Sequence, residues 1–173
     1  MNIIDHLRHI RRLLDDENID FALIGGLAIG VYGVQRFTSG IDLLIDGTVR
    51  LHLKKVLSFN GFSIFSETAE VMQFDGPIPV DVLCANRPLG LAMLHDAKVE
   101  PLLGVKVIDV EGLIALKIQA YCNDPKRSLR DKSDIAALIE KNTQSLNWQR
   151  IRSYADLFGE WPTIEELKKI HES

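Results

Sequence analysis

The sequence has few cysteines, no long apolar run and no excess of positive charge, and each absence excludes a class of protein. Cys84 and Cys122 are too few for a disulfide framework, and we interpret both as small buried residues of a cytoplasmic protein. No apolar run approaches the roughly 20 residues that a membrane-spanning helix needs, so we expect no membrane partner. The net charge of −4 argues against a broad basic face that coats nucleic acid.

The residues that are present suffice for a substantial core, because 46% of the 173 residues are hydrophobic. This length fits one domain with a helical tail. Apolar periodicity predicts an α+β fold, in which a mixed β-sheet flanked by helices occupies residues 1–110 and a helical extension packed on it occupies residues 111–173. Strands are predicted at 21–24, 41–45, 63–66, 71–74, 79–83 and twice within 98–109, and helices at 2–16, 27–34, 49–59, 111–122, 128–141, 148–158 and 163–171.

Two carboxylates lie inside apolar strands. Asp42 follows Ile41 in the second predicted strand, and Asp81 lies between Val80 and Val82 in a later one. A carboxylate in such surroundings needs a cation, an arginine or hydrogen-bond donors. For Asp42, an ion pair with Arg36 would also meet that need. If the two strands are neighbours, the carboxylates converge across the sheet and repel each other unless a cation or a proton lies between them.

Four motifs in order resemble those of the DNA polymerase β-type nucleotidyltransferase superfamily. They are Gly25-Gly26 before a short helix, Arg36-x-Thr38 before Asp42 with Asp81 on a later strand, Leu116-Lys117-x-Gln119-Ala120, and Arg130-Asp131-x-x-Asp134-Ile135. The chain is also similar to small bacterial nucleotidyltransferases related to the toxins of abortive-infection toxin–antitoxin pairs. The resemblance covers residues 20–141.

The resemblance implies a nucleotidyltransferase fold and a set of site residues. Asp42 and Asp81 would hold Mg²⁺ or Mn²⁺, and Asp81 would also be a possible base for the incoming hydroxyl. Gly25 and Gly26 would contact the triphosphate of ATP or another NTP. Further nucleotide contacts would come from Arg36, Thr38, Lys117 and Asp134.

The sequence departs from this family at Gly40, where the first aspartate of an Asp-x-Asp pair is expected. Asp46 shares the face of Asp42 but lies roughly 13 Å along the strand, too far to bind the same ion. Glu67 or Glu70 could swing in only from a loop. The metal site is therefore predicted to be incomplete. Both a natural loss of the ligand and a single Asp-to-Gly change remain open.

Lys117 lies on a helix that is apolar almost all round, so its ammonium group needs an anion. The partner is either a carboxylate such as Asp134 or a nucleotide phosphate, unless the side chain extends to the surface. Asp131 fits a capping box with Ser128 at the start of the next helix. The family resemblance favours a catalytic or phosphate-binding role for Lys117.

The predicted function is Mg²⁺-dependent transfer of a nucleotide from an NTP to a hydroxyl acceptor on a protein, an RNA or a small molecule. The alternative is a catalytically inactive protein of the same fold that binds a nucleotide or a partner. The toxin resemblance adds a possible cognate antitoxin or regulator. The sequence alone leaves the acceptor and the preferred base open.

Overall fold

The computed structural model describes residues 1–172 and divides them into two compact units. The sheet unit comprises Met1–Ala28 and Arg36–Asp109, and the helical unit comprises Ile29–Gln35 and the chain from Val110 onward. The single division predicted after residue 110 stays a prediction about domain organisation. None of the helices in the described residues is long and apolar enough to cross a membrane.

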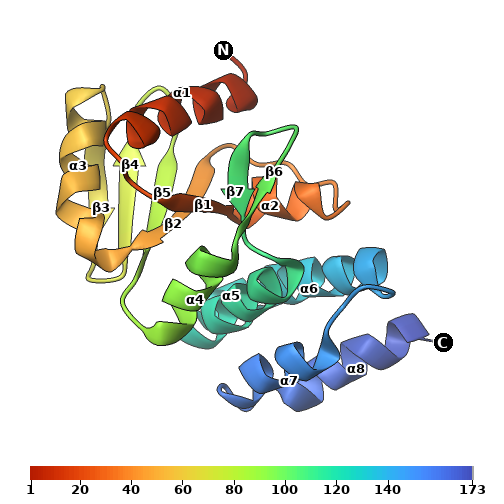
Figure 1. The fold of residues 1–173 in the computed structure, drawn as a ribbon. Coiled ribbons are helices and arrows are strands. Elements are labelled where there is room, and N and C mark those ends of the chain that lie inside the picture. Colours follow the sequence, from red (N-terminus) through yellow and green to blue (C-terminus); the bar gives the residue numbers. More distant parts are fainter. Residues whose placement is uncertain (173) are drawn as a thin grey trace. The chain divides into compact units, whose positions relative to one another are not determined.

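The sheet unit contains a mixed sheet whose strands run in the order β3-β4-β5-β2-β1-β7-β6 (Figure 1). The pairs β2–β5 and β1–β7 are parallel and the other neighbours are antiparallel. In chain order the elements are α1 (Ile3–Asp16), β1 (Phe21–Ile24), α2 (Gly25–Val31, which continues into the helical unit), β2 (Ile41–Asp46), the 3-10 turn η1 (Gly47–Val49), α3 (Arg50–Phe59), β3 (Ser63–Glu67), β4 (Val71–Asp75), β5 (Val80–Ala85), α4 (Pro88–Asp96), β6 (Lys98–Glu100) and β7 (Val105–Val107). The structure thus confirms the predicted α+β class with helices flanking a mixed sheet.

The central strands β4, β5 and β2 bury one face of the sheet completely. The residues on that face are Met72, Phe74, Val80, Val82, Cys84, Ile41, Leu43 and Ile45. Because side chains alternate along a strand, the intervening residues project from the opposite face. That opposite face is only partly buried, and it carries Gln73, Asp81 and Asp42.

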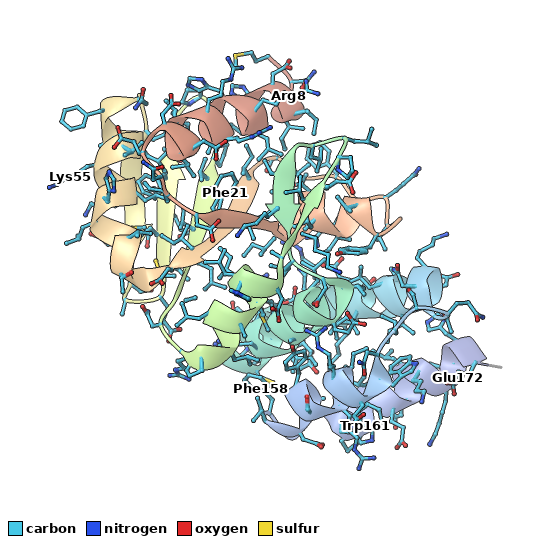
Figure 2. All side chains as sticks on the ribbon, viewed as in Figure 1. Arg8, Phe21, Lys55, Phe158, Trp161 and Glu172 are labelled. Atoms are coloured by element: carbon cyan, nitrogen blue, oxygen red, sulfur yellow. The ribbon has the colours of Figure 1, made fainter. Side chains whose placement is uncertain are left out.

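Helices pack on the sheet unit through apolar stripes with helical spacing. Leu7, Ile10 and Leu14 give α1 one fully buried side, and an Asn2–Asp5 capping box fixes its start. On α3 the buried side consists of Leu53, Val56 and Leu57. Lys55 lies between those residues in sequence, and its side chain points away from the sheet (Figure 2).

The helical unit contains the C-terminal helices α5 (Val110–Asn123), α6 (Ser128–Asn142), α7 (Trp148–Asp156) and α8 (Trp161–Glu172), with the 3-10 turn η2 (Pro125–Arg127) before α6. Its core consists of Leu113, Ile114, Ile118, Ile135, Leu138, Ile139, Ile151 and Ile164. Near the turn that joins α7 to α8, marked by Phe158 and Trp161 in Figure 2, Glu160 accepts a 2.7 Å hydrogen bond from the hydroxyl of Tyr121 on α5. This bond joins α5 to the α7–α8 turn within the unit.

The cysteine prediction is only half right. Cys84 is buried on β5, as expected for a small apolar side chain. Cys122 is exposed near the end of α5, so its prediction as a buried residue is wrong. Ile118 and Tyr121 are buried on the inner side of α5, whereas Cys122 lies on its exposed side in the last turn.

Candidate functional site

Asp42 and Asp81 are direct neighbours in the sheet. The parallel strands β2 and β5 pair residue by residue, and Asp42 stands opposite Asp81. Paired residues project from the same face at about 5 Å between adjacent strands. The sequence-based prediction that these carboxylates converge is therefore confirmed. Both residues are half-buried.

Gly25 gives the turn between β1 and α2 the space to close over Asp42. Its φ of +68° lies in the left-handed region that glycine adopts readily. A Cβ at this position would overlap the carboxylate of Asp42. The requirement for glycine thus comes from the carboxylate of Asp42, and phosphate contact by Gly25 stays a prediction.

Gly26 makes a similar close approach to Thr38. A Cβ at Gly26 would lie 2.8 Å from the Cβ of Thr38. The Thr38 hydroxyl donates a 3.1 Å hydrogen bond to the carbonyl oxygen of Gly40. The sequence motif therefore holds the loop before β2 against the glycine turn. Arg36 lies half-buried in the same loop.

Gly40 borders Pro79, the residue that precedes β5. The Ile41 amide donates to the Pro79 carbonyl oxygen at 3.0 Å, which brings the two chains together at this point. A Cβ at Gly40 would lie 2.9 Å from that oxygen and 3.3 Å from the Pro79 Cβ. A side chain at position 40 therefore requires the Pro79 backbone to move.

The other carboxylates considered as substitutes have partners elsewhere. Asp46 caps η1, where its Oδ1 accepts 2.8 Å hydrogen bonds from the amide and the hydroxyl of Thr48. Glu67 lies on the edge strand β3 and is bound by Arg50 at 2.8 Å and Lys54 at 2.7 Å. Hydrogen bonds from Lys54 and Arg50 lower the pKa of Glu67. Neither carboxylate fills the position of the missing ligand.

The donor set nevertheless fits a hard divalent cation. Carboxylate oxygens are the ligands that Mg²⁺ and Mn²⁺ prefer, and two of them lie side by side here. Within residues 1–172, no group of three or more His, Cys, Asp or Glu side chains could hold a metal ion. Asp42 and Asp81 thus offer two neighbouring carboxylates, and their binding of a cation stays a prediction.

Lys117 belongs to the helical unit and is bound by two carboxylates there. Its Nζ lies 3.1 Å from Asp131 and 2.9 Å from Asp134, and all three residues are buried. The predicted pairing with Asp134 is confirmed. The capping prediction for Asp131 is wrong, because the start of α6 has no side-chain cap. Instead Asp131 accepts hydrogen bonds from Lys117 and from Arg127.

Opposing effects act on the pKa of Asp131. Its burial alone would raise the pKa, but the hydrogen bond from Arg127 and the charge of Lys117 together hold it below the ordinary value. The carboxylate is therefore ionised at neutral pH. This ion-pair network accounts for a buried lysine without a phosphate, and contact between Lys117 and a nucleotide stays a prediction.

The requirement for glycine at position 40 is testable by adding a single methyl group. We expect Gly40→Ala to lower the free energy of unfolding by about 1–3 kcal/mol, because the new Cβ meets the Pro79 carbonyl. Gly30→Ala in α2 is the matched control, since a Cβ there meets nothing within 4 Å. Chemical denaturation measures both. Equal stability of Gly40→Ala and the parent protein would contradict the close approach.

Solved structures with the same fold are nucleotidyltransferases. The structure is similar to that of ANT(2")-Ia in complex with adenylyl-2"-tobramycin, with a TM-score of 0.66 and 16% identity. The match covers 90% of this chain and 95% of the other. An antigenic nucleotidyltransferase-like protein from Paracoccidioides brasiliensis matches with a TM-score of 0.55 and 20% identity over 94% of this chain and 89% of that one. The lincomycin-bound lincosamide adenylyltransferase LnuA matches with a TM-score of 0.54 and 17% identity, over 78% and 94% of the two chains. The chain therefore has the nucleotidyltransferase fold.

Sequence comparison alone adds no relative. No protein-family profile matches the chain, and no curated protein matches it in sequence. The likeness to the solved structures therefore concerns the fold.

Proposed function

We propose that this protein binds an NTP with Mg²⁺ or Mn²⁺ and transfers its nucleotide to a hydroxyl group of a small molecule, with pyrophosphate as the leaving group. One observation carries the proposal: Asp42 and Asp81 stand opposite each other on parallel strands of a nucleotidyltransferase fold. A divalent cation held by these carboxylates would neutralise the charge on the transferring phosphate. Asp81 also suits the role of base, accepting the proton of the acceptor hydroxyl.

The glycine turn and the loop before β2 would position the nucleotide. Gly25 and Gly26 bring the backbone of α2 close to Asp42 and Thr38 without an intervening side chain. Arg36, in the same loop as Thr38, has the planar fork of donors that matches a phosphate. We further propose that Lys117 and Asp134 contribute to nucleotide binding, as the resemblance implies.

A small-molecule acceptor is favoured by how much of each neighbour the chain spans. The chain covers 95% of ANT(2")-Ia and 94% of LnuA, whose structures hold an adenylylated and a free antibiotic. It covers 32% of the Megavirus polyadenylate synthase, which has a TM-score of 0.53. The match thus corresponds to about a third of that neighbour's length. The toxin resemblance supports a protein or RNA acceptor and a cognate antitoxin instead.

One observation favours a second function, a nucleotide-binding protein without transferase activity. Gly40 removes one carboxylate ligand, and the close approach of Pro79 hinders its simple replacement. Fewer negative ligands weaken the binding of a divalent cation. Such a protein would bind an NTP and release it unchanged.

The test combines binding with transfer. Calorimetry with each of the four NTPs, with and without Mg²⁺ or Mn²⁺, measures binding. Incubation with α-labelled NTP and a panel of aminoglycosides, lincosamides and tRNA measures transfer. We expect metal-dependent binding and label on a small molecule. Binding without transfer to any acceptor supports the second function. Label on tRNA would show that the acceptor is an RNA and not a small molecule. The absence of binding to any NTP overturns both functions.

A further inference from the structure

Gln73 extends the row of polar side chains that Asp81 and Asp42 begin. On the antiparallel strands β4 and β5, Gln73 stands opposite Asp81, which in turn stands opposite Asp42 on β2. The three strands lie side by side in the sheet (Figure 1). Met72 and Phe74, which flank Gln73, are buried on the other face. The three polar side chains therefore project from one face, in one line across three strands.

The amide of Gln73 reaches the carboxylate of Asp81. Its Nε2 lies 3.4 Å from both Oδ1 and Oδ2 of Asp81. These distances are long for hydrogen bonds between nitrogen and oxygen. The oxygen and nitrogen of a glutamine amide exchange places by a half turn about its last side-chain bond. The same reach therefore brings Oε1 of Gln73 to the carboxylate pair.

Position 73 provides what position 40 lacks. A side chain at Gly40 would meet the backbone of Pro79, whereas Gln73 is half-buried on the face of the carboxylates. Amide carbonyl oxygens bind hard cations alongside carboxylates. Two carboxylates and one neutral amide carry a charge of −2, which a divalent cation balances.

We propose that the side-chain carbonyl of Gln73 is the third protein ligand of the divalent cation held by Asp42 and Asp81. The inference rests on the proposed function, since it concerns the cation of that site. In this proposal the third ligand comes from β4, on the other side of Asp81, and not from β2, the strand of Asp42. A site of this kind accommodates Gly40 without a vacant ligand position.

Calorimetric titration of Mn²⁺ and Mg²⁺ into the full chain tests the proposal. Gln73→Met keeps the length of the side chain and removes its oxygen, and we expect it to weaken cation binding about tenfold or more. Gln73→Glu keeps an oxygen ligand and adds a charge, and we expect it to tighten binding. Asp42→Asn is the reference variant that loses binding. Thermal unfolding without metal shows whether each variant is folded.

A spectroscopic readout distinguishes a ligand from a residue that only supports Asp81. Direct coordination shifts the side-chain carbonyl ¹³C resonance of Gln73 when Mg²⁺ is added, and turns its amide group away from Asp81. If Asp42→Asn abolishes binding but Gln73→Met binds as the parent does, the Gln73 inference is overturned and the metal site stands. If the parent protein binds neither cation, even with ATP, the metal site and the Gln73 inference both fail.

Discussion

Asp81→Asn is expected to abolish cation-dependent NTP binding and transfer while leaving the metal-free protein as stable as the parent or more stable. The two effects have opposite signs because the carboxylates of Asp81 and Asp42 are neighbours in register. The proposed cation would be bound by both carboxylates, so asparagine would remove a charged ligand. Without a cation, the same substitution removes repulsion between like charges. A residue needed only for folding would lose binding and stability together.

The measurements are calorimetric titration with Mn²⁺ and ATP, and thermal unfolding in the presence of a chelator. We expect cation affinity to fall by more than about 100-fold, since even outer partners of a metal site change affinity by 10- to 100-fold. Asp46→Asn is the matched control: it lies on the same face of β2, but its carboxylate caps η1 through Thr48. Asparagine also caps helices well, so both readouts should change little. Retained cation binding in Asp81→Asn would refute the assigned metal site.

The carboxylate pair was predictable because buried strands have a recognisable apolar sequence pattern. A single aspartate within an apolar strand stands out, and alternation assigns it to a face. The register of β2 against β5 then places Asp42 and Asp81 opposite each other. Gln73 gave no such signal, because glutamine is common on half-buried strands. Its place in the row follows only from the pairing of β4 with β5, which is a tertiary fact.

Helix α4 and the second partner of Lys117, Asp131, were missed for local reasons. The segment of α4 begins with a proline at the first helical position, which suits a helix start, but Gly90 interrupts its apolar pattern. A Cβ at Gly90 would lie 3.0 Å from the Cβ of Ala85, and this tight approach favours glycine there. Asp131 fits a cap by sequence spacing. In the structure its position three residues before Asp134 directs both carboxylates toward the same lysine.

Lys117→Met is expected to destabilise the protein by about 3–5 kcal/mol at pH 7. The substitution preserves much of the side-chain volume but leaves the buried carboxylates of Asp131 and Asp134 without their shared cation. Asp131 keeps its contact with Arg127 at 3.0 Å, whereas Asp134 loses its 2.9 Å ion pair with Lys117. Urea unfolding measures the loss. Lys55→Met, at an exposed position of α3, is the control and should change stability by less than about 0.5 kcal/mol.

The pH dependence separates the charge effect from a packing defect. In the parent protein the pKa of Asp131 is lowered, so its stabilising contribution is present above the unfolded value of about 3.8 and is lost as pH falls through the folded pKa. In Lys117→Met, fewer positive charges oppose the effect of burial on Asp131, so the pKa of Asp131 rises. Protonation of Asp131 in mild acid then removes a buried negative charge and recovers part of the variant's stability. The stability difference between the two proteins should therefore narrow as pH falls from 7 toward 4. A difference that stays constant over this range would indicate lost packing.

A double variant restores the fold and then reveals any further role of the lysine. Adding Asp134→Asn to Lys117→Met removes one of the two buried carboxylates that lost the lysine and should recover part of the lost stability, which a double-mutant cycle measures. Once that protein is folded, its NTP affinity can be compared with that of Asp134→Asn alone. Weaker binding in the double variant assigns a phosphate contact to Lys117 in addition to its ion pairs. Equal affinity confines Lys117 to the stability of the helical unit, and nucleotide binding then rests on the sheet unit.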